Sequence, residues 1–421
     1  MNMRVMTLGL ALFLGGPGIG GAQASFVVRN VRVFDGQRVL EGRDVLVTNG
    51  TVARIDAAGS AVPDGIAIVN GTGRTLLPGL MDAHVHVSDS TVPDLHQAIT
   101  LGVTTMFDMF SAGSRFDAMK AIERVDRSDV ASVRSAGIGA SAPGGHPSQM
   151  GGPPFPMVTD SSQSQDFVNA RVTEGSDYVK IIYDDLASMG RSLPRLDRGA
   201  LFGLVAAAHA AGKLAVVHAM SEAQASTAID AGADGLVHLF NAATVSPEFA
   251  RLVASHRAFV VPTLTVHHAS CGESTGPAVA ADTLLMPWVR PAMRSQVLRS
   301  FGARPGISCE GTREAVRQLA REGVPILAGT DAPSPGHAYG ASLHYELQLL
   351  VRSGLTPVQA LTAATLAPAR AFRLNDRGAI APGARADLLL VDGDPTVTIA
   401  DTRRIVTVWK RGVVVDRARY P

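Results

Sequence analysis

The sequence predicts an α/β protein: a closed (β/α)8 barrel with a second, smaller β unit formed from both ends of the chain. From about residue 80, short apolar runs alternate with helical stretches, which indicates a parallel sheet covered by helices. Eight such units over ~290 residues suit a closed barrel. The segments before and after this region read instead as short strands and turns. A chain of 421 residues is long enough for both parts.

The first residues read as an export signal. A short basic start ends at Arg4, the apolar run Val5–Leu14 follows, and Ala22-Gln23-Ala24 is a small-x-small cleavage site. The apolar run is too short to span a bilayer, which takes about 20 residues. We therefore expect a signal peptide over 1–24 that is cut after Ala24. The mature protein would be periplasmic or secreted, without stable membrane insertion.

The mature chain divides into three expected segments. Residues 25–79 form the first part of the β unit, with Asp35-Gly36 and Asn49-Gly50 as hairpin turns. Residues 80–374 form the barrel, and the pattern of residues 375–421 is again typical of short β-strands. The simplest architecture joins the two β segments into one unit.

The barrel elements follow from the alternating pattern. The first strand starts at Leu80. The other expected strands span 103–107, 132–138, 178–182, 214–218, 235–239, 259–264 and 325–329. Helices are expected at 115–124, 167–174, 200–211, 223–231, 247–255, 312–322, 342–352 and 357–372. Two long loops, 141–162 and 265–311, would lie at the carboxyl ends of the strands and form walls of a substrate pocket.

Composition excludes some functions. Hydrophobic residues make up 46% and charged residues 18%, so a large core is possible and disorder is not expected. Net charge is +1, which does not suggest the basic face of a nucleic-acid-binding protein. The two cysteines, Cys271 and Cys309, lack metal-ligand spacing. They are compatible with two free thiols, or with a disulfide in an oxidising compartment, which export slightly favours.

The run Leu77 to His86 is the most informative motif. It reads as a strand that ends in His-x-His, and residues two apart on a strand point the same way. His84 and His86 would therefore aim their imidazoles at one point, and neutral imidazole binds zinc and its first-row neighbours. Further candidates lie at later strand ends: Lys180, His218, His238 and Asp331. Each alone could be a core histidine, a surface lysine or a turn residue, but a barrel brings all of them to one face.

These motifs resemble the amidohydrolase superfamily in its two-metal form. The resemblance covers most of residues 26–421 and rests on Pro78–His86, Ala328–Asp331 and Gly378–Leu388. The last motif is typical of members that carry a β-sandwich. The resemblance therefore implies a TIM barrel with a small β-sandwich built from the N- and C-terminal segments.

The resemblance also implies a role for each candidate. His84, His86 and Asp331 would hold one divalent metal ion, and His218 and His238 the other, with zinc the expected metal. Lys180 would be carboxylated by CO₂ and bridge both ions, because an ammonium group has no lone pair to donate. A bridging hydroxide would attack a carbonyl polarised by two ions ~3.5–4 Å apart. Asp331 would orient the hydroxide and pass its proton to the leaving amine.

Other polar residues are candidates for substrate contact. His146, in a Gly-Gly-His-Pro loop, and Tyr183, just after Lys180, are expected to contact the substrate or its tetrahedral intermediate; each could also be purely structural. His267 or His268 could line the pocket. Arg290 and Arg294 are candidate partners for a substrate carboxylate.

The Val-Lys-Ile lysine and the Gly-Gly-His loop resemble the imidazolonepropionase-related branch of the superfamily. That branch includes Xaa-Pro and Xaa-Arg dipeptidases, carboxypeptidases and ochratoxin-type amidases. The resemblance implies a hydrolase of N-acyl amino acids or dipeptides that releases an amino acid, and we expect a homo-oligomer. Lactone, phosphotriester or cyclic-amide hydrolysis on the same centre stays an alternative. Lys180 argues against a mononuclear deaminase, and the full ligand set against a non-catalytic binding protein.

Overall fold

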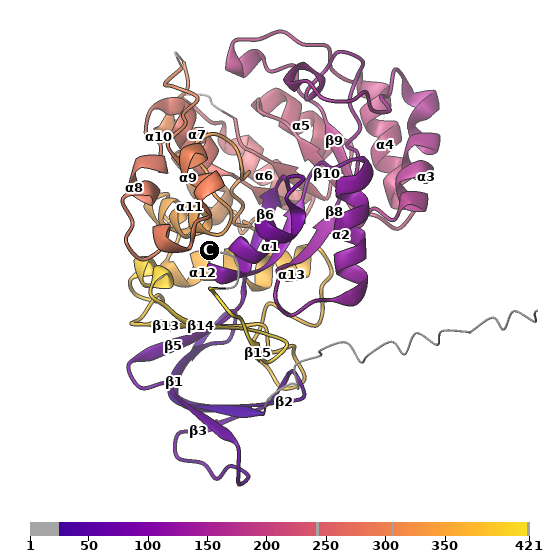
Figure 1. Cartoon of the computed structure of the whole chain (residues 1–421). Helices are drawn as coiled ribbons and strands as arrows, with labels where there is room; N and C mark the ends of the chain where they lie inside the picture. Colours follow the sequence, from indigo (N-terminus) through magenta and orange to yellow (C-terminus); the bar gives the residue numbers. More distant parts are fainter. Residues whose placement is uncertain (1–24, 241–243, 305, 419–421) are drawn as a thin grey trace, which may run out of the picture.

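The computed structural model describes residues 25–240, 244–304 and 306–418 (Figure 1). The expected signal peptide, 1–24, lies outside these residues. In the part of the chain described, no helix combines the length and the apolar character needed to cross a bilayer.

An eight-stranded sheet unites the two ends of the chain and lies at one end of the molecule in Figure 1. Its order is β15-β14-β13-β5-β1-β2-β3, with β4 beside β1. The strands are β1 (Phe26–Phe34), β2 (Val39–Thr48), β3 (Thr51–Ala57), β4 (Ala67–Asn70), β5 (Arg74–Pro78), β13 (Leu388–Asp392), β14 (Ile405–Lys410) and β15 (Val413–Val414). The antiparallel pair β5–β13 joins the N-terminal strands to the C-terminal ones. The two ends thus form one sheet, and the β-sandwich stays a prediction.

Local chemistry explains this sheet. Asn49 and Gly50 adopt positive φ angles of 49° and 74° in the tight turn between β2 and β3, as an Asn-Gly hairpin requires. On its buried face, the ring of Phe26 stacks on Trp409 with centroids 5.0 Å apart, and alternating valines of β1 complete this apolar core.

The α/β part contains two parallel sheets rather than one continuous barrel sheet. One holds β6 (Leu80–Val85), β7 (Val103–Asp108) and β8 (Ser132–Ser135). The other holds β9 (Val179–Ile182), β10 (Ala215–His218), β11 (Gly235–Val237) and β12 (Phe259–Val261). Isolated parallel bridges lie between them, at Ala140–Ile181, Val260–Ile326 and Val85–Ala332.

The expected eighth strand, 325–329, is the main departure from the predicted barrel. Its backbone N–H groups donate to two different elements. Leu327 N donates to Val260 O in β12, whereas Ala328 N donates to Ala363 O at the end of the helix that spans 357–363. Because Pro325 has no N–H, the segment makes one isolated bridge, Val260–Ile326, and no regular ladder.

Helices enclose these strands, with α2–α4 on one side and α7–α11 on the other in Figure 1. They are α1 (Thr91–Thr100), α2 (Gly113–Val125), α3 (Ser164–Glu174), α4 (Arg198–Ala210), α5 (Glu222–Asp230), α6 (Pro247–Ser255), α7 (Leu264–Cys271), α8 (Gly276–Ala280), α9 (Pro291–Val297), α10 (Cys309–Arg321), α11 (Ala341–Arg352), α12 (Pro357–Ala363) and α13 (Leu366–Ala371). The helix predicted over 357–372 is two helices, because Pro368 cannot donate a backbone hydrogen bond to the preceding turn.

The two long loops differ in character. The segment 141–162 is irregular apart from short 3₁₀ turns. The segment 265–311, expected as a loop, contains most of α7 and all of α8 and α9. Leu264 to Ser270 of α7 are all buried, so this helix has no apolar stripe that periodicity could reveal. A disulfide between Cys271 and Cys309 joins α7 to α10, which resolves the alternative left open by the sequence.

Candidate metal centre

Strand β6 positions the first group of candidate ligands. His84 is fully buried near the end of β6, and His86 is the first residue after this strand. Their Nε2 atoms lie 3.4 Å apart. Asp331 Oδ1 lies 3.3 Å from His84 Nε2 and 3.1 Å from His86 Nε2. These side chains are close enough to hold one metal ion. The structure therefore brings together the three residues predicted from the His-x-His motif and the distant Thr-Asp segment.

A buried carboxylate on the same strand holds Asp331 in place. Asp82 accepts hydrogen bonds from Thr330 N at 3.0 Å and from Thr330 Oγ1 at 2.7 Å. The backbone N–H of Asp331 donates to His84 O at 2.7 Å. Asp82 was not among the predicted site residues, although it lies within the motif Pro78–His86.

The second pair of imidazoles lies at the ends of the neighbouring strands. His218 ends β10, and His238 follows β11 directly. The His238 ring centroid is 4.5 Å from that of His218 and 4.7 Å from that of His84. All four imidazoles thus surround one point at the carboxyl ends of the strands, as expected for a site on this fold.

Each member of this second pair has one ring nitrogen engaged by a neighbour. His218 Nε2 lies 3.1 Å from Asp184 Oδ2, and His238 Nδ1 lies 2.8 Å from Thr263 Oγ1. These contacts leave Nδ1 of His218 and Nε2 of His238 for another ligand. Outer partners of this kind fix the orientation of metal-bound histidines. Neither Asp184 nor Thr263 was predicted; for Asp184, its place just after β9 was the available signal.

Lys180 enters the centre from β9 and is buried. Its Nζ has no hydrogen-bond partner among the described residues. Burial lowers the pKa of Lys180 to about 7, against the opposing charges of Asp331 and Asp108. A substantial fraction of the amine is therefore neutral near pH 7, which is the form that reacts with CO₂ or donates to a metal.

The protonation states suit metal binding. Burial, aided by Lys180, lowers the pKa of His84 to about 3, and burial with His218 lowers that of His238 well below its ordinary value. Burial raises the pKa of Asp331, but contacts with His84 and His86 outweigh it and bring the pKa well below the ordinary value. Neutral imidazoles and an ionised carboxylate are the forms that bind divalent metals.

The backbone at the centre is unusual. His238, Thr263 and Asp331 have positive φ angles of 68°, 47° and 58°. Residues with side chains rarely adopt this conformation, and a β-branched threonine does so least readily. Such conformations cost about 1–3 kcal/mol each and gather at functional sites.

The two predicted substrate-contact residues both contact His218, His146 through its ring and Tyr183 through its backbone. The His146 ring centroid is 5.2 Å from that of His218, and burial lowers its pKa to about 3. Tyr183 is buried, and its N–H donates to His218 O at 3.0 Å. The guanidinium carbon of Arg195 lies 4.8 Å from the Tyr183 ring centroid, so a cation stacks on this tyrosine.

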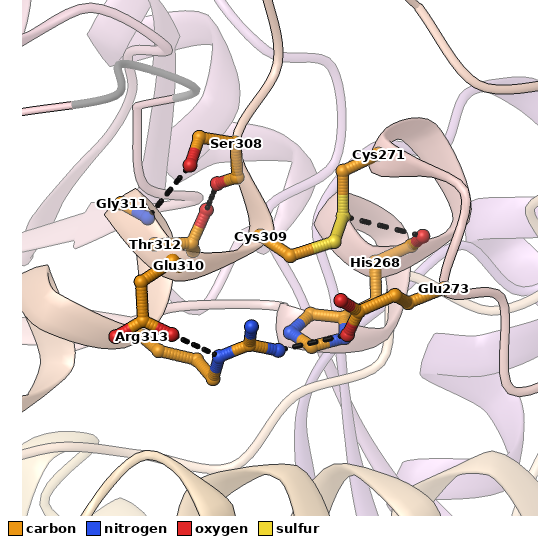
Figure 2. The surroundings of a disulfide bond; sticks show 9 residues. All are labelled: His268, Cys271, Glu273, Ser308, Cys309, Glu310, Gly311, Thr312 and Arg313. Carbon is orange, nitrogen blue, oxygen red and sulfur yellow. Dashed lines mark hydrogen bonds and ion pairs between the residues drawn. A yellow bond between two sulfur atoms is a disulfide. The ribbon is translucent and has the colours of Figure 1, made fainter.

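The other residues predicted to contact substrate make contacts within the protein instead. Arg290 forms an ion pair with the buried Asp94, and Arg294 donates to Val289 O at 2.9 Å. His267 Nε2 accepts a hydrogen bond from Leu239 N at 3.0 Å, and its ring lies 6.3 Å from that of His238. His267 thus supports the wall of the centre, whereas His268 lies beside the disulfide (Figure 2).

Comparison with known proteins gives a family match. The profile of the amidohydrolase family matches residues 75–415. Adenine deaminase 3 of Rhizobium meliloti (strain 1021) is 27% identical over 401 residues, covering 88% of this chain and 55% of the deaminase. Imidazolonepropionase of Streptomyces griseus subsp. griseus is 36% identical over 109 residues, covering 25% of this chain and 28% of that enzyme. The matches thus span about half of these curated relatives or less.

Solved structures show the shared fold. A Xaa-Pro dipeptidase with bound methionine in the active site superimposes with a TM-score of 0.75 at 20% identity. The match covers 93% of this chain and 99% of the dipeptidase chain.

Proposed function

Because the chain belongs to the amidohydrolase family, whose members depend on metal ions, we propose that it hydrolyses the amide bond of N-acyl amino acids or dipeptides and releases an amino acid. The observation that carries this proposal is the buried Lys180 Nζ, without a hydrogen-bond partner among the described residues, in the midst of four imidazoles and Asp331. This arrangement supports a two-metal centre, and it disfavours the mononuclear alternative.

The donor set fits two divalent ions. His84, His86 and Asp331 would hold one, and His218 and His238 the other, with Lys180 carboxylated and bridging. Nitrogen and carboxylate oxygen donors suit zinc, which is the proposed metal. When bound, such ions lower the pKa of water and polarise the scissile carbonyl.

The chain's own residues would handle protons and orientation. Asp331, ionised and held through Asp82 and Thr330, would accept a proton and deliver it to the leaving amine. His146 and Tyr183 border His218 and would orient the substrate carbonyl. Loop 141–162 would exclude water above them.

The amino-acid part of the substrate carries a carboxylate, which needs a cation. Arg195 stacks on Tyr183, and its Nε lies 3.6 Å from Asp185, with its side chain 39% exposed. This long contact leaves N–H groups of the Arg195 guanidinium available to a substrate, whereas Arg290 forms an ion pair with Asp94. We therefore assign the substrate carboxylate to Arg195 in place of Arg290 and Arg294.

A hydrolysis panel tests the proposal. The zinc-loaded protein is incubated with dipeptides and N-acyl amino acids that end in Pro, Phe or Arg, and a chelator-treated sample serves as control. We expect chelator-sensitive release of a free amino acid. Adenine, a lactone and a phosphotriester complete the panel, since the sequence relatives include a deaminase. Turnover of one of these alone would replace the amidase assignment.

A further inference from the structure

The two cysteines of the disulfide and the neighbouring His268 form a second group of side chains of the kind that bind metals (Figure 2). Cys271 ends α7 and Cys309 begins α10, and His268 lies one turn before Cys271 on the same face of α7. One ring nitrogen of His268 and the two sulfur atoms lie within 4.8 Å of one another. None of these residues belongs to the centre formed by His84 and its neighbours.

The imidazole of His268 is prepared for a ligand. The residue is 1% exposed, its Nδ1 lies 3.3 Å from Glu273 Oε2, and its Nε2 is buried without a hydrogen-bond partner in the described parts of the chain. Burial lowers the pKa of His268 to about 4, with Glu273 opposing, so the ring is neutral at pH 7. A buried nitrogen left unpaired destabilises the folded protein, and a bound ligand would remove this cost.

We propose that reduction of the disulfide creates a zinc site formed by His268, Cys271 and Cys309, with water as the fourth ligand. Two thiolates and one imidazole are a known donor set for tetrahedral zinc. Glu273, itself 2.8 Å from Arg313 Nη1, would hold the histidine in the way that carboxylates support zinc-bound imidazoles.

The order of reduction follows from exposure and helix polarity. A dithiol reductant attacks Sγ of the half-buried Cys271, the S–S bond breaks, and the electron pair passes to Sγ of Cys309. Cys309 lies at the N-terminus of α10, where the helix stabilises a thiolate. The second thiol of the reductant then displaces Cys271 as a cyclic disulfide forms. Two electrons and two protons enter the protein, and zinc binding later releases the two protons to solvent.

This site would keep α7 attached to α10 in both redox states. α7 also carries His267, which accepts the hydrogen bond from Leu239 N beside His238. A zinc cross-link would therefore preserve the wall of the catalytic centre when the covalent cross-link is lost.

Cobalt is the probe, because thiolate-to-cobalt charge transfer gives a near-ultraviolet absorption that nitrogen and oxygen ligands do not. The full chain is reduced with a dithiol, freed of it by anaerobic gel filtration, and titrated with Co²⁺. We expect this absorption in the reduced protein and none in the oxidised protein. Since the chain has only two cysteines, the signal reports this site alone, whatever binds at the other centre.

His268→Gln should weaken the cobalt affinity of this site by about tenfold or more, since losing even an outer partner of a metal ligand costs about 10–100-fold. His256→Gln, at an exposed histidine, is the matched control and should leave it unchanged. In the wild-type chain, zinc should slow alkylation of both thiols. No charge-transfer absorption after reduction, equal affinity in the two variants, or alkylation unaffected by zinc would each overturn the proposal. The alkylation assay decides if a variant does not fold.

Discussion

At the scale of single residues, the candidate centre depends on neighbours that engage one ring nitrogen of His218 and one of His238. Asp184 engages His218 through Nε2, whereas Thr263 engages His238 through Nδ1. The two imidazoles therefore present different nitrogens. Lys180 has no such partner among the described residues, and its burial without one is costly to the metal-free fold.

Lys180→Met keeps the side-chain volume and removes the amine. We expect the bound metal to fall from two ions per chain to one or fewer, with amidase activity lost. In the metal-free wild-type protein, the folded pKa of about 7 lies below the ordinary 10.5, so unfolding free energy should rise with pH between these values. The slope would be up to about 1.4 kcal/mol per pH unit, and the variant should lack it.

Metal analysis after dialysis and urea unfolding at several pH values measure both effects. Lys213→Ala, at a half-buried lysine that donates to Ser176 O, is the control. A Lys180 variant that retains two ions and full activity would contradict the bridging role.

Asp184→Asn keeps a hydrogen-bond acceptor beside His218 but removes its charge. We expect about 10–100-fold weaker zinc affinity, because charged outer partners raise the basicity of the histidine they hold. Competition with a zinc-chelating dye measures the affinity. Asp185→Asn is the matched control, since that side chain accepts from Ala187 N, pairs with Arg195 and forms no hydrogen bond with His218 among the described residues. Equal affinities in the two variants would refute the assignment.

At the scale of elements, buried polar residues tie the helices to one another. Glu346 on α11 accepts from the backbone N–H groups of Leu264 and Thr265 at the start of α7. His344 on the same helix contacts Leu101 O through Nε2 and Thr402 Oγ1 through Nδ1, each at 3.0 Å. The position of α11 is thereby set by groups at distant points of the chain.

His344 makes this link sensitive to acid. Burial lowers its pKa to about 4, below the ordinary 6.5, although the contact with Leu101 O opposes the shift. The stability contributed by the neutral ring is therefore present above pH 6.5 and is lost as pH falls toward 4, by up to about 1.4 kcal/mol per pH unit. Urea unfolding of His344→Gln should show a slope smaller by up to this amount. His256→Gln should match wild type; a His344 variant that also does so would exclude this source of acid sensitivity.

At the scale of the whole molecule, one carboxylate joins the terminal sheet to the α/β part. Asp126, the left-handed residue that ends α2, lies 3.0 Å from guanidinium nitrogens of both Arg385 and Arg411. Lys410 Nζ, 1% exposed on β14, lies 3.7 Å from the same carboxylate and donates to Val130 O at 2.7 Å. Removing this charge would take the anion from the buried Lys410, whereas Arg385 would keep its ion pair with Asp387 at 3.0 Å.

Asp126→Asn tests this junction, since asparagine also tolerates the left-handed conformation. Breaking a buried ion pair costs about 3–5 kcal/mol, and Asp126 is 29% exposed, so we expect a loss of about 2–3 kcal/mol in unfolding free energy. Urea unfolding followed by tryptophan fluorescence measures it. Asp117→Asn, exposed on the same helix, should cost little. Equal stability of the two variants would show that the junction does not depend on this charge.

The alternation of strands and helices, the family resemblance and the candidates at strand ends all follow from the amino-acid sequence. Periodicity is local, and a residue that ends a parallel strand must lie on the face where such ends meet. Thus His84, His218 and Lys180 could be named before any coordinates.

Other features depend on contacts between distant parts of the chain. Hydrogen-bond and ion-pair partners far apart in sequence determine that Thr263 engages Nδ1 of His238, and that Arg290 pairs with Asp94 while Arg195 stacks on Tyr183. Helix α7 was not predicted because it is buried all round and carries no apolar stripe. The pairing of Cys271 with Cys309 likewise depends on packing across 38 residues of chain, which local pattern does not encode.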